Sequence, residues 1–470
     1  MADDAPNLAG MSTSAAPTAG TPGGGESTAP AGNPRGRVVV ASLIGTSIEF
    51  YDFYIYATAA SLVFPALFFP NAEDPTTQLL SSFAVFGVAF VARPVGSVLF
   101  GHFGDRIGRK ATLVASLLTM GIATVLIGLI PAASTPGWAL AAPAVLVLCR
   151  FCQGLGLGGE WSGAALLATE NAPEGKRAIY GTFPQLGAPI GFILANTVFI
   201  ALSTSLTPEQ FAAWGWRIPF IASAVLVIVG LWVRLSLLET PAFRKVLAAE
   251  AVSKVPVARV FRTSWRQIVS GTFIMLATYA LFYLMTTFTL NYGVAPTAPT
   301  DGSPAGLGYE KIDFLWMLII GVVFFGIFTL VSGPMAEKFG RRKHLIWVTV
   351  AIIVFGALFV PLFAAGDVGV QTLLILGFTL MGLTFGPMAA VLPELFPANV
   401  RYTGSGIAYN LSSVLGAAVA PFIAVWLWAG AGGSPVLVGV YLSAMAVITL
   451  VALLMTRETR DVDYADNVGD

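Results

Sequence analysis

The chain is short of charged side chains and of the residues that bind metals or form disulfides. Only 11% of its 470 residues are Asp, Glu, Lys or Arg, against roughly 25% in soluble globular domains. Its two cysteines, Cys149 and Cys152, have a Cys-x-x-Cys spacing, but a structural zinc needs four ligands and the two histidines, His102 and His344, lie elsewhere in charged turns. We therefore expect buried thiols, no metal and no cofactor.

Other absences exclude further classes of protein. Lys and Arg (25) balance Asp and Glu (25), so nothing in the charge suggests a nucleic-acid partner. No Gly-x-x-x-x-Gly-Lys-Ser/Thr segment is present to bind ATP. The glycine run 154–159 follows no strand and lies in an apolar stretch, which favours close packing or bending of helices. No nucleophile–base pair or metal cluster suggests an enzyme.

Apolar residues are what the chain has most of. They make up 56% of the sequence, and the mean hydropathy is +0.79, which places the chain in a lipid bilayer. Twelve apolar stretches are long enough to cross about 30 Å of hydrocarbon. We therefore expect an all-α integral membrane protein with twelve transmembrane helices, at 38–61, 79–100, 111–131, 139–163, 179–202, 215–237, 267–290, 313–334, 345–365, 370–392, 402–428 and 434–455.

The connections between these stretches predict the domain organisation. Basic residues gather in alternate connections, and the count of spans is even, so both termini are expected to be cytoplasmic in a cell-membrane protein. The predicted parts are a disordered tail (1–36), a six-helix half (37–237), a basic cytoplasmic linker (238–266), a second six-helix half (267–456) and a C-terminal tail (457–470).

The chain also repeats itself. The charged segment 101–110, Gly-His-Phe-Gly-Asp-Arg-Ile-Gly-Arg-Lys, returns in degraded form at 333–342. Glu170 with Arg177 likewise matches Glu394 with Arg401 after a later span. Parallel repeats of six spans are one architecture of secondary transporters, so the repeat points to transport.

These motifs resemble a known family. The repeated Gly-x-x-x-Asp-Arg-x-Gly-Arg-Lys segment resembles the signature of the major facilitator superfamily, and the stretches 49–53, 150–161 and 393–397 resemble the metabolite:proton symporters. That family includes proline/betaine, α-ketoglutarate, citrate and shikimate permeases. The resemblance covers about residues 36–460, and it implies twelve helices, alternating access and uptake of substrate together with a proton.

Few ionisable residues lie inside the spans, and such residues are costly in hydrocarbon, so they are functional candidates. Glu49 and Asp52 are three residues apart with Tyr56 on the same stripe, so we expect both carboxylates to face one side. Arg150 lies at a similar depth in span four. A substrate that competes for Arg150 would change carboxyl protonation, which is a route to proton coupling. The alternative is a static ion pair between spans one and four.

Three further charged residues have two interpretations each. Glu160, near the cytoplasmic end of span four, is a second proton site or gate, or else it pairs with a basic turn. Arg93 in span two binds an anionic substrate or has a structural role. Arg217, beside Trp214 and Trp216, is better explained as an anchor at the membrane interface.

Uncharged polar side chains within the spans could line a binding site, and each could equally be a contact between helices. Tyrosine rings could also hold a quaternary ammonium group. These candidates are Gln153, Gln185, Asn196, Tyr279, Tyr283 and Asn410. Proline residues mark places where helices bend during transport, namely Pro184, Pro189, Pro387 and Pro421.

The charged repeats predict gating rather than chemistry. We expect Asp105, and Glu337 in the second copy, to hold the two halves together on the cytoplasmic side. A purely topological role is predicted for the basic run 341–343. The gating candidates are Gly101, Asp105, Arg106, Gly108, Arg109, Glu170, Arg177, Glu337, Glu394 and Arg401.

The leading functional hypothesis is a proton-coupled symporter, monomeric in the bilayer, that imports a small organic acid such as a dicarboxylate or a shikimate-like metabolite. A proline/betaine-type osmolyte symporter is the alternative within the family. The chain ends about ten residues past Arg460 without a heptad-bearing tail, which favours organic acids. An uncoupled facilitator or channel is the alternative of another class, while a membrane enzyme or receptor has little support.

Overall fold

The computed structural model describes residues 35–72, 74–107, 109–235, 256–299, 303–397 and 400–462, and every regular element in these ranges is helical. The helices before residue 236 are α1 (Arg35–Leu62), α2 (Phe64–Phe68), α3 (Pro75–Ile107), α4 (Arg109–Leu129), α5 (Ala141–Gly158), α6 (Glu160–Glu170), α7 (Arg177–Gln185), α8 (Gly187–Ser205), α9 (Pro208–Gln210), η1 (Phe211–Gly215) and α10 (Arg217–Leu235). Those after residue 255 are α12 (Pro256–Thr263), α13 (Trp265–Tyr283), η2 (Leu284–Phe288), α14 (Thr289–Val294), α15 (Lys311–Phe339), α16 (Arg341–Ala357), α17 (Phe359–Ala364), α18 (Gly366–Phe385), α19 (Met388–Glu394), α20 (Arg401–Ser412), η3 (Ser413–Ala418), α21 (Ala420–Gly430) and α22 (Val436–Met455).

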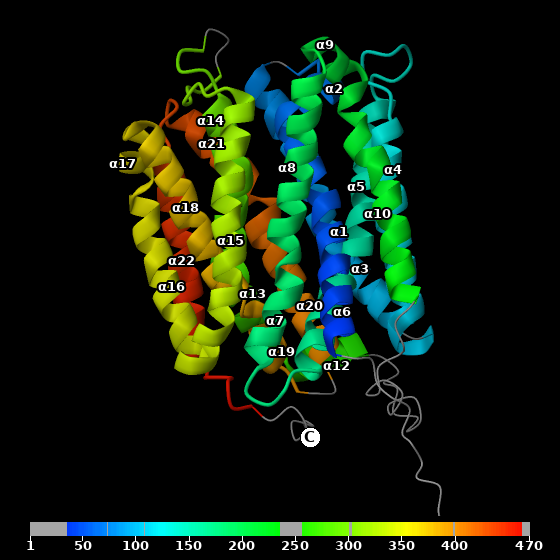
Figure 1. Cartoon of the computed structure of the whole chain (residues 1–470), viewed down its shortest axis with the longest axis vertical. Helices are drawn as coiled ribbons and strands as arrows, with labels where there is room; N and C mark the ends of the chain where they lie inside the picture. The colour runs from blue at the N-terminus through cyan, green and yellow to red at the C-terminus, as the bar shows by residue number, and fades with distance from the viewer. Residues whose placement is uncertain are drawn as a thin grey trace, which may run out of the picture. The chain divides into compact units, whose positions relative to one another are not determined.

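The long helices lie roughly along one common axis, so the bundle has two ends (Figure 1). We call the end with α2 and α9 the loop end and the end with α12 and α19 the charged end. The described residues 35–235 are called the first half of the chain, and the described residues among 256–462 are called the second half. These names state position in the sequence only.

All twelve predicted spans fall on a helix or on consecutive helices. Eight helical stretches of the described chain are long and apolar enough to cross a membrane, and a ninth is the pair Pro208–Gly215 and Arg217–Val233, which bends by 44°. The remaining three predicted spans fall on α1, which carries two acids, on α4, whose apolar part is Val114–Leu129, and on α16 with α17.

Several spans are broken where the sequence predicted bends. Span five is interrupted between α7 and α8 next to Pro184, and span ten between α18 and α19 at Pro387. Span eleven changes from the π-helical turn η3 to α21 just before Pro421. Proline removes a backbone donor and clashes with the preceding turn, so these positions are natural break points.

The glycine run in span four has both predicted effects. A Cβ atom at Gly154 would collide with the carbonyl of Ala89, and one at Gly158 with that of Arg93. The backbones of α3 and α5 therefore touch directly, as small residues allow in membrane helices. The span also breaks at Gly159, where α5 ends and α6 begins.

One expectation about the charged segment 101–110 is wrong, because most of it is not a turn. Helix α3 continues to Ile107 and α4 begins at Arg109. No proline interrupts this segment, and charged side chains can extend a helix beyond the apolar region. Gly108 lies outside the described residues, and the side chains of Gly101, Asp105, Arg106 and Arg109 are not described, so the gating roles of these five residues stay predictions.

Parts of the predicted tails and linker also lie outside the described residues, namely 1–34, 236–255 and 463–470. The described end of the linker forms α12. Its Val260 is buried against Ile268 and Phe396, so this helix packs on the second half of the chain.

Aromatic rings form part of the contact between the two halves. Phe53 of α1 packs against Tyr283 of α13, with 5.9 Å between ring centroids, and Phe50 meets Phe385 of α18 at 6.3 Å.

Candidate functional site

Asp52 belongs to a hydrogen-bonded chain within the first half. It is 1% exposed, and it accepts hydrogen bonds from Ser223 of α10 (2.6 Å) and Thr124 of α4 (3.1 Å). Gln153 donates to the Thr124 hydroxyl at 2.7 Å, and Arg150 donates to Gln153 at 2.6 Å. Asp52 and Arg150 are therefore connected through two neutral side chains.

The direct pairing of Asp52 with Arg150, one of the two readings from the sequence, is wrong. The two Nη atoms of Arg150 donate to Gln153 and to the backbone carbonyl of Phe86, the latter at 3.0 Å. Its Cζ atom lies 3.8 Å from the ring centre of Tyr56. Gln153 follows Arg150 by one helical turn, so it fills the space between the arginine and α4.

Glu49 does not face the same neighbours as Asp52. Three residues correspond to about 300° around a helix, which leaves the two side chains about 60° apart. Asp52 faces α4 and α10, whereas Glu49 is buried close enough to Arg93, Tyr283 and Tyr409 to interact with them electrostatically. The expectation of one shared carboxylate face is thus corrected.

Arg93 of α3 lies at the contact between the halves. It is 5% exposed, and its Cζ atom lies over the rings of Phe90 (4.9 Å) and Phe53 (5.2 Å). Three tyrosines of the second half interact with it electrostatically, namely Tyr279, Tyr283 and Tyr409. Among the described residues, it donates no hydrogen bond and forms no ion pair, and its Nε atom has no acceptor.

The polar aromatic side chains near Arg93 form a connected group. The Trp161 ring of α6 stacks on the Tyr409 ring of α20 at 3.8 Å with 6° between the planes, and Tyr279 lies 5.3 Å from Tyr409. Trp161 donates to Gln185 (3.1 Å), whose amide donates to the carbonyl of Phe385 (2.9 Å). We call Arg93, Trp161, Tyr279, Tyr283 and Tyr409 the central site.

Sequence reasoning placed three members of this neighbourhood, Gln185, Tyr279 and Tyr283, and left Arg93 open. It missed Trp161 and Tyr409. The available signals were the position of Trp161 directly after Glu160 and that of Tyr409 directly before Asn410.

The remaining predicted lining residues hold helices together. Asn410 donates to Ser97 and, at 3.0 Å, to the Gly158 carbonyl, so it links α20 to α3 and α5. Asn196 accepts from Thr58 at 3.1 Å within the first half. Glu160 is buried at the first position of α6. Their roles in binding or proton transfer stay predictions.

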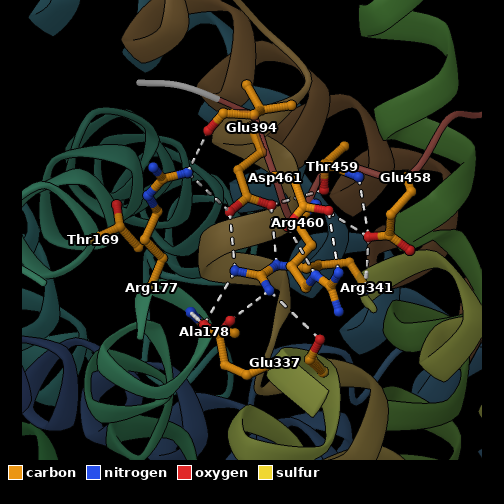
Figure 2. Close-up of polar contacts among 12 residues, drawn as sticks. Thr169, Arg177, Ala178, Glu337, Arg341, Glu394, Glu458, Thr459, Arg460 and Asp461 are labelled. Carbon is orange, nitrogen blue, oxygen red and sulfur yellow. Dashed lines mark hydrogen bonds and ion pairs between the residues drawn. The ribbon is translucent and has the colours of Figure 1, made fainter. Parts of the chain in front are cut away.

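A cluster of ion pairs lies at the charged end (Figure 2). Arg341, at the start of α16, forms ion pairs with Glu337 of α15 (2.7 Å) and with Glu394 of α19 (3.3 Å). Glu394 also lies 3.9 Å from Arg177 of α7. The backbone N–H of Ala178 donates to Glu337 at 2.7 Å, so the cluster links α7 of the first half to three helices of the second.

The segment that follows α22 completes the charged-end cluster. Thr459 donates to Glu394 at 2.8 Å, and Arg177 donates to the carbonyl of Val462 at 2.7 Å. Glu458 accepts from the backbone N–H groups of Arg341 (2.8 Å) and Arg342 (3.1 Å). A carboxylate at a helix N-terminus is favourable, so Glu458 caps α16.

Two expectations about this end are wrong or incomplete. Arg341 is 2% exposed and paired, so a purely topological role is excluded for it, because the acids Glu337 and Glu394 draw it into the bundle. Glu170, the repeat partner of the buried Glu394, is instead exposed at the end of α6. Arg401 is buried and donates to the carbonyl of Phe396 at 3.3 Å.

Arg217 has hydrogen-bond partners at the end of a neighbouring helix, and its role as an interfacial anchor stays a prediction. It donates to the carbonyls of Gly128 (2.9 Å) and Ile130 (2.6 Å), which closes the end of α4. Of its two neighbouring tryptophans, Trp216 is fully buried and Trp214 is exposed.

The cysteines and one histidine lie on helices of both halves. Cys149 is buried, whereas Cys152 is only partly so. His344 is not in a turn but is buried in α16 with Nε2 2.7 Å from the Leu383 carbonyl. In the part of the chain that the structure describes, no three His, Cys, Asp or Glu side chains are grouped to hold a metal ion.

The apolar helices of this bundle, with a buried polar centre, are those of a multi-pass membrane protein. The family model described as "Sugar (and other) transporter" matches residues 38–465, so the chain belongs to this family of the major facilitator superfamily. The resemblance stated from the motifs is confirmed.

Curated relatives cover nearly the whole chain. The "Inner membrane metabolite transport protein YhjE" of Escherichia coli K12 is 58% identical over 430 residues, 91% of this chain and 95% of the relative. The "Shikimate transporter" of the same strain is 35% identical over 434 residues, 90% and 95% of the two chains. Its "Proline/betaine transporter" is 31% identical over 438 residues, 90% and 83%.

Solved structures agree on the fold. The "proton:xylose symporter XylE bound to 6-bromo-6-deoxy-D-glucose" has a TM-score of 0.73 at 17% identity, over 90% of this chain and 96% of that one. The predicted all-α membrane fold with two six-helix halves is confirmed.

Proposed function

We propose that the protein is a proton-coupled symporter that imports a small organic acid by alternating access. The observation that supports this most directly is the pair of buried acids on α1, Glu49 and Asp52, near two buried arginines, Arg93 and Arg150. Such groups are costly in a membrane unless they serve transport or pair with one another.

The geometry suggests how coupling would work. Asp52 connects to Arg150 through Thr124 and Gln153, and because an arginine can only donate, every hydrogen bond of this chain points from Arg150 toward Asp52. Glu49 lies beside Arg93. A substrate anion that engages an arginine changes the charge balance around the nearby acid. A proton on that acid restores neutrality, so substrate and proton would cross together.

We further propose that the charged end faces the cytoplasm and that the protein resides in the cell membrane with both termini inside. The concentration of basic residues in the connections at this end supports this orientation. The charged-end cluster would then hold the cytoplasmic side shut while the site opens outward, with Arg177, Glu337 and Glu394 as gating residues. The predicted domain boundaries and the monomeric state belong to the same proposal.

The test is uptake into proteoliposomes with an imposed proton gradient. Labelled α-ketoglutarate, shikimate, benzoate, proline and betaine are compared, each with and without the gradient. We expect an acid to accumulate above its outside concentration only with the gradient. Equal inside and outside concentrations under both conditions would contradict coupling and support an uncoupled facilitator.

A proline/betaine-type osmolyte symporter is the second candidate. The aromatic rings around the central site can hold a quaternary ammonium group, and relatives named proline/betaine transporters are 31–32% identical. Accumulation of betaine but of none of the acids would favour this candidate.

A further inference from the structure

We infer that Arg93, together with Tyr279, Tyr283 and Tyr409, binds the carboxylate of a monocarboxylic substrate whose body is a ring or an apolar group. This inference rests on the proposed function and deepens it, because it assigns the anion site to Arg93 rather than to Arg150.

The first argument is the hydrogen bonding of the two arginines. An arginine captures a carboxylate best with two parallel N–H groups. Both Nη atoms of Arg150 already donate, to Gln153 and to Phe86, although its Nε has no acceptor. A bidentate carboxylate at Arg150 would have to break one of these bonds. Arg93 has no hydrogen bond of its own to break with any residue that the structure describes.

The second argument is position. The neighbours of Arg150 belong to the first half of the chain, namely Phe86, Gln153 and Tyr56. The two rings under Arg93, Phe53 and Phe90, pack against Tyr283 of α13 with 5.9 and 5.4 Å between ring centroids, which places Arg93 at the contact between the halves. Tyr279 and Tyr409, whose rings lie 5.3 Å apart, are close enough to interact with Arg93 electrostatically. A ligand between Arg93 and these hydroxyls would touch both halves, so its binding could bias their relative movement.

The third argument concerns the class of substrate. Arg93 lies over Phe53 and Phe90, and the stacked pair Trp161 and Tyr409 lies nearby. Such surroundings suit an apolar or ring-shaped body. Among the described residues of the bundle core, Arg93 is the arginine without hydrogen bonds, and the Nη atoms of Arg150 already donate to other groups. A second carboxylate on the substrate would therefore be buried without a cationic partner, which is costly. A monocarboxylate is therefore favoured over a dicarboxylate.

A simpler role for Arg93 is to balance the charge of Glu49, and the test must separate the two roles. The purified protein in detergent is titrated calorimetrically with shikimate, benzoate, α-ketoglutarate and betaine, and with the methyl ester of the acid that binds most tightly. We expect shikimate or benzoate to bind about tenfold or more tightly than α-ketoglutarate, and the ester to lose binding.

Variants then assign the site. Arg93→Gln should weaken binding of the acid by about 30-fold or more, and Arg93→Lys should recover part of this loss. Tyr279→Phe and Tyr283→Phe should each weaken it by about fivefold. The matched control is Tyr441→Phe, which removes a buried hydroxyl of α22 that has no partner in the described chain and lies outside the central site. Its affinity should equal that of the wild type, and a size-exclusion profile and melting temperature verify folding of every variant.

The double variant Glu49→Gln/Arg93→Gln decides between the two roles. If Arg93 binds the carboxylate, the double variant stays as weak as Arg93→Gln. Recovery of binding in the double variant, or wild-type affinity in Arg93→Gln, would overturn the inference while leaving the proposed symport intact. An acid that binds to the wild type but never accumulates in proteoliposomes would instead refute proton coupling. Binding of betaine alone would overturn the inference, because its trimethylammonium group is neither a ring nor apolar, and it would favour the osmolyte symporter over the organic-acid symporter.

Discussion

The central site and the charged-end cluster both bring charged residues of separate helices together, but they differ in hydrogen bonding. At the charged end, Arg341 makes ion pairs with two acids and its backbone N–H is capped by Glu458. At the centre, Arg93 has aromatic rings and tyrosines around it but donates no hydrogen bond to a described residue. A cluster whose charged groups all have partners within the protein is suited to hold the two halves together. A site whose arginine lacks hydrogen-bond partners is suited to receive a ligand.

The largest effect is expected from breaking the charged-end cluster. Arg341→Ala leaves Glu337 and Glu394 without their shared cation, and removal of one member of a buried ion pair costs about 3–5 kcal/mol. We expect a clear fall in melting temperature and an opening of the charged end, measured by the labelling rate of a cysteine introduced at Ala178. Lys343→Ala is the control, because that side chain is exposed. Equal stability of both variants would show that the cluster contributes little.

The next comparison separates the two acids of α1. Asp52→Asn keeps an oxygen that accepts from Ser223 or Thr124, and Glu49→Gln keeps the size of the side chain but removes the charge near Arg93. If the coupling proton is carried at the centre, Glu49→Gln abolishes gradient-driven accumulation but permits exchange of labelled for unlabelled substrate. Asp52→Asn should then retain accumulation.

The reverse pattern in the two acids would place coupling in the chain that links Asp52 to Arg150. Loss of both accumulation and exchange in both variants would contradict a role in protonation alone. The same proteoliposomes serve for both measurements, so that differences in reconstitution cancel.

The smallest effect is expected at the border of the central site. Gln185→Leu removes the hydrogen bond to the Phe385 carbonyl across the halves, worth about 1 kcal/mol. Asn196→Leu removes a similar buried amide whose partners, Thr58 and Phe192, lie in one half. Both should lower the melting temperature slightly, but only Gln185→Leu should change cysteine accessibility between the two ends. A change in accessibility with Asn196→Leu as well would show that the effect is not specific to the contact between halves.

Much of the fold could be predicted from the sequence because bilayer thickness fixes helix length and apolar runs report it directly. The breaks next to Pro184, Pro387 and Pro421 followed from proline chemistry. The extension of α3 to Ile107 could not be predicted in this way, because the hydropathy of the sequence falls there while the helix continues.

The candidate site was harder to predict because polar contacts depend on angles that sequence spacing gives only approximately. Three residues of separation left Glu49 and Asp52 with different neighbours. Arg341 looked like one of three equivalent surface cations, and only the fold brings Glu394 and Thr459 to its side. The missing acceptor of Arg93 is a property of its surroundings and has no counterpart in the sequence.

The bare backbone contact between α3 and α5 has a mechanical consequence. A single methyl group at Gly154 or Gly158 would force α3 and α5 apart, so the two helices are expected to move together as a rigid pair. Arg93 is carried by α3 and Arg150 by α5, so the alternating access proposed above would move the tyrosines of the second half relative to both arginines without changing the distance between the arginines. If the protein works by alternating access, the side chains opposite the two arginines would therefore change during transport, while the spacing of the arginines would stay the same.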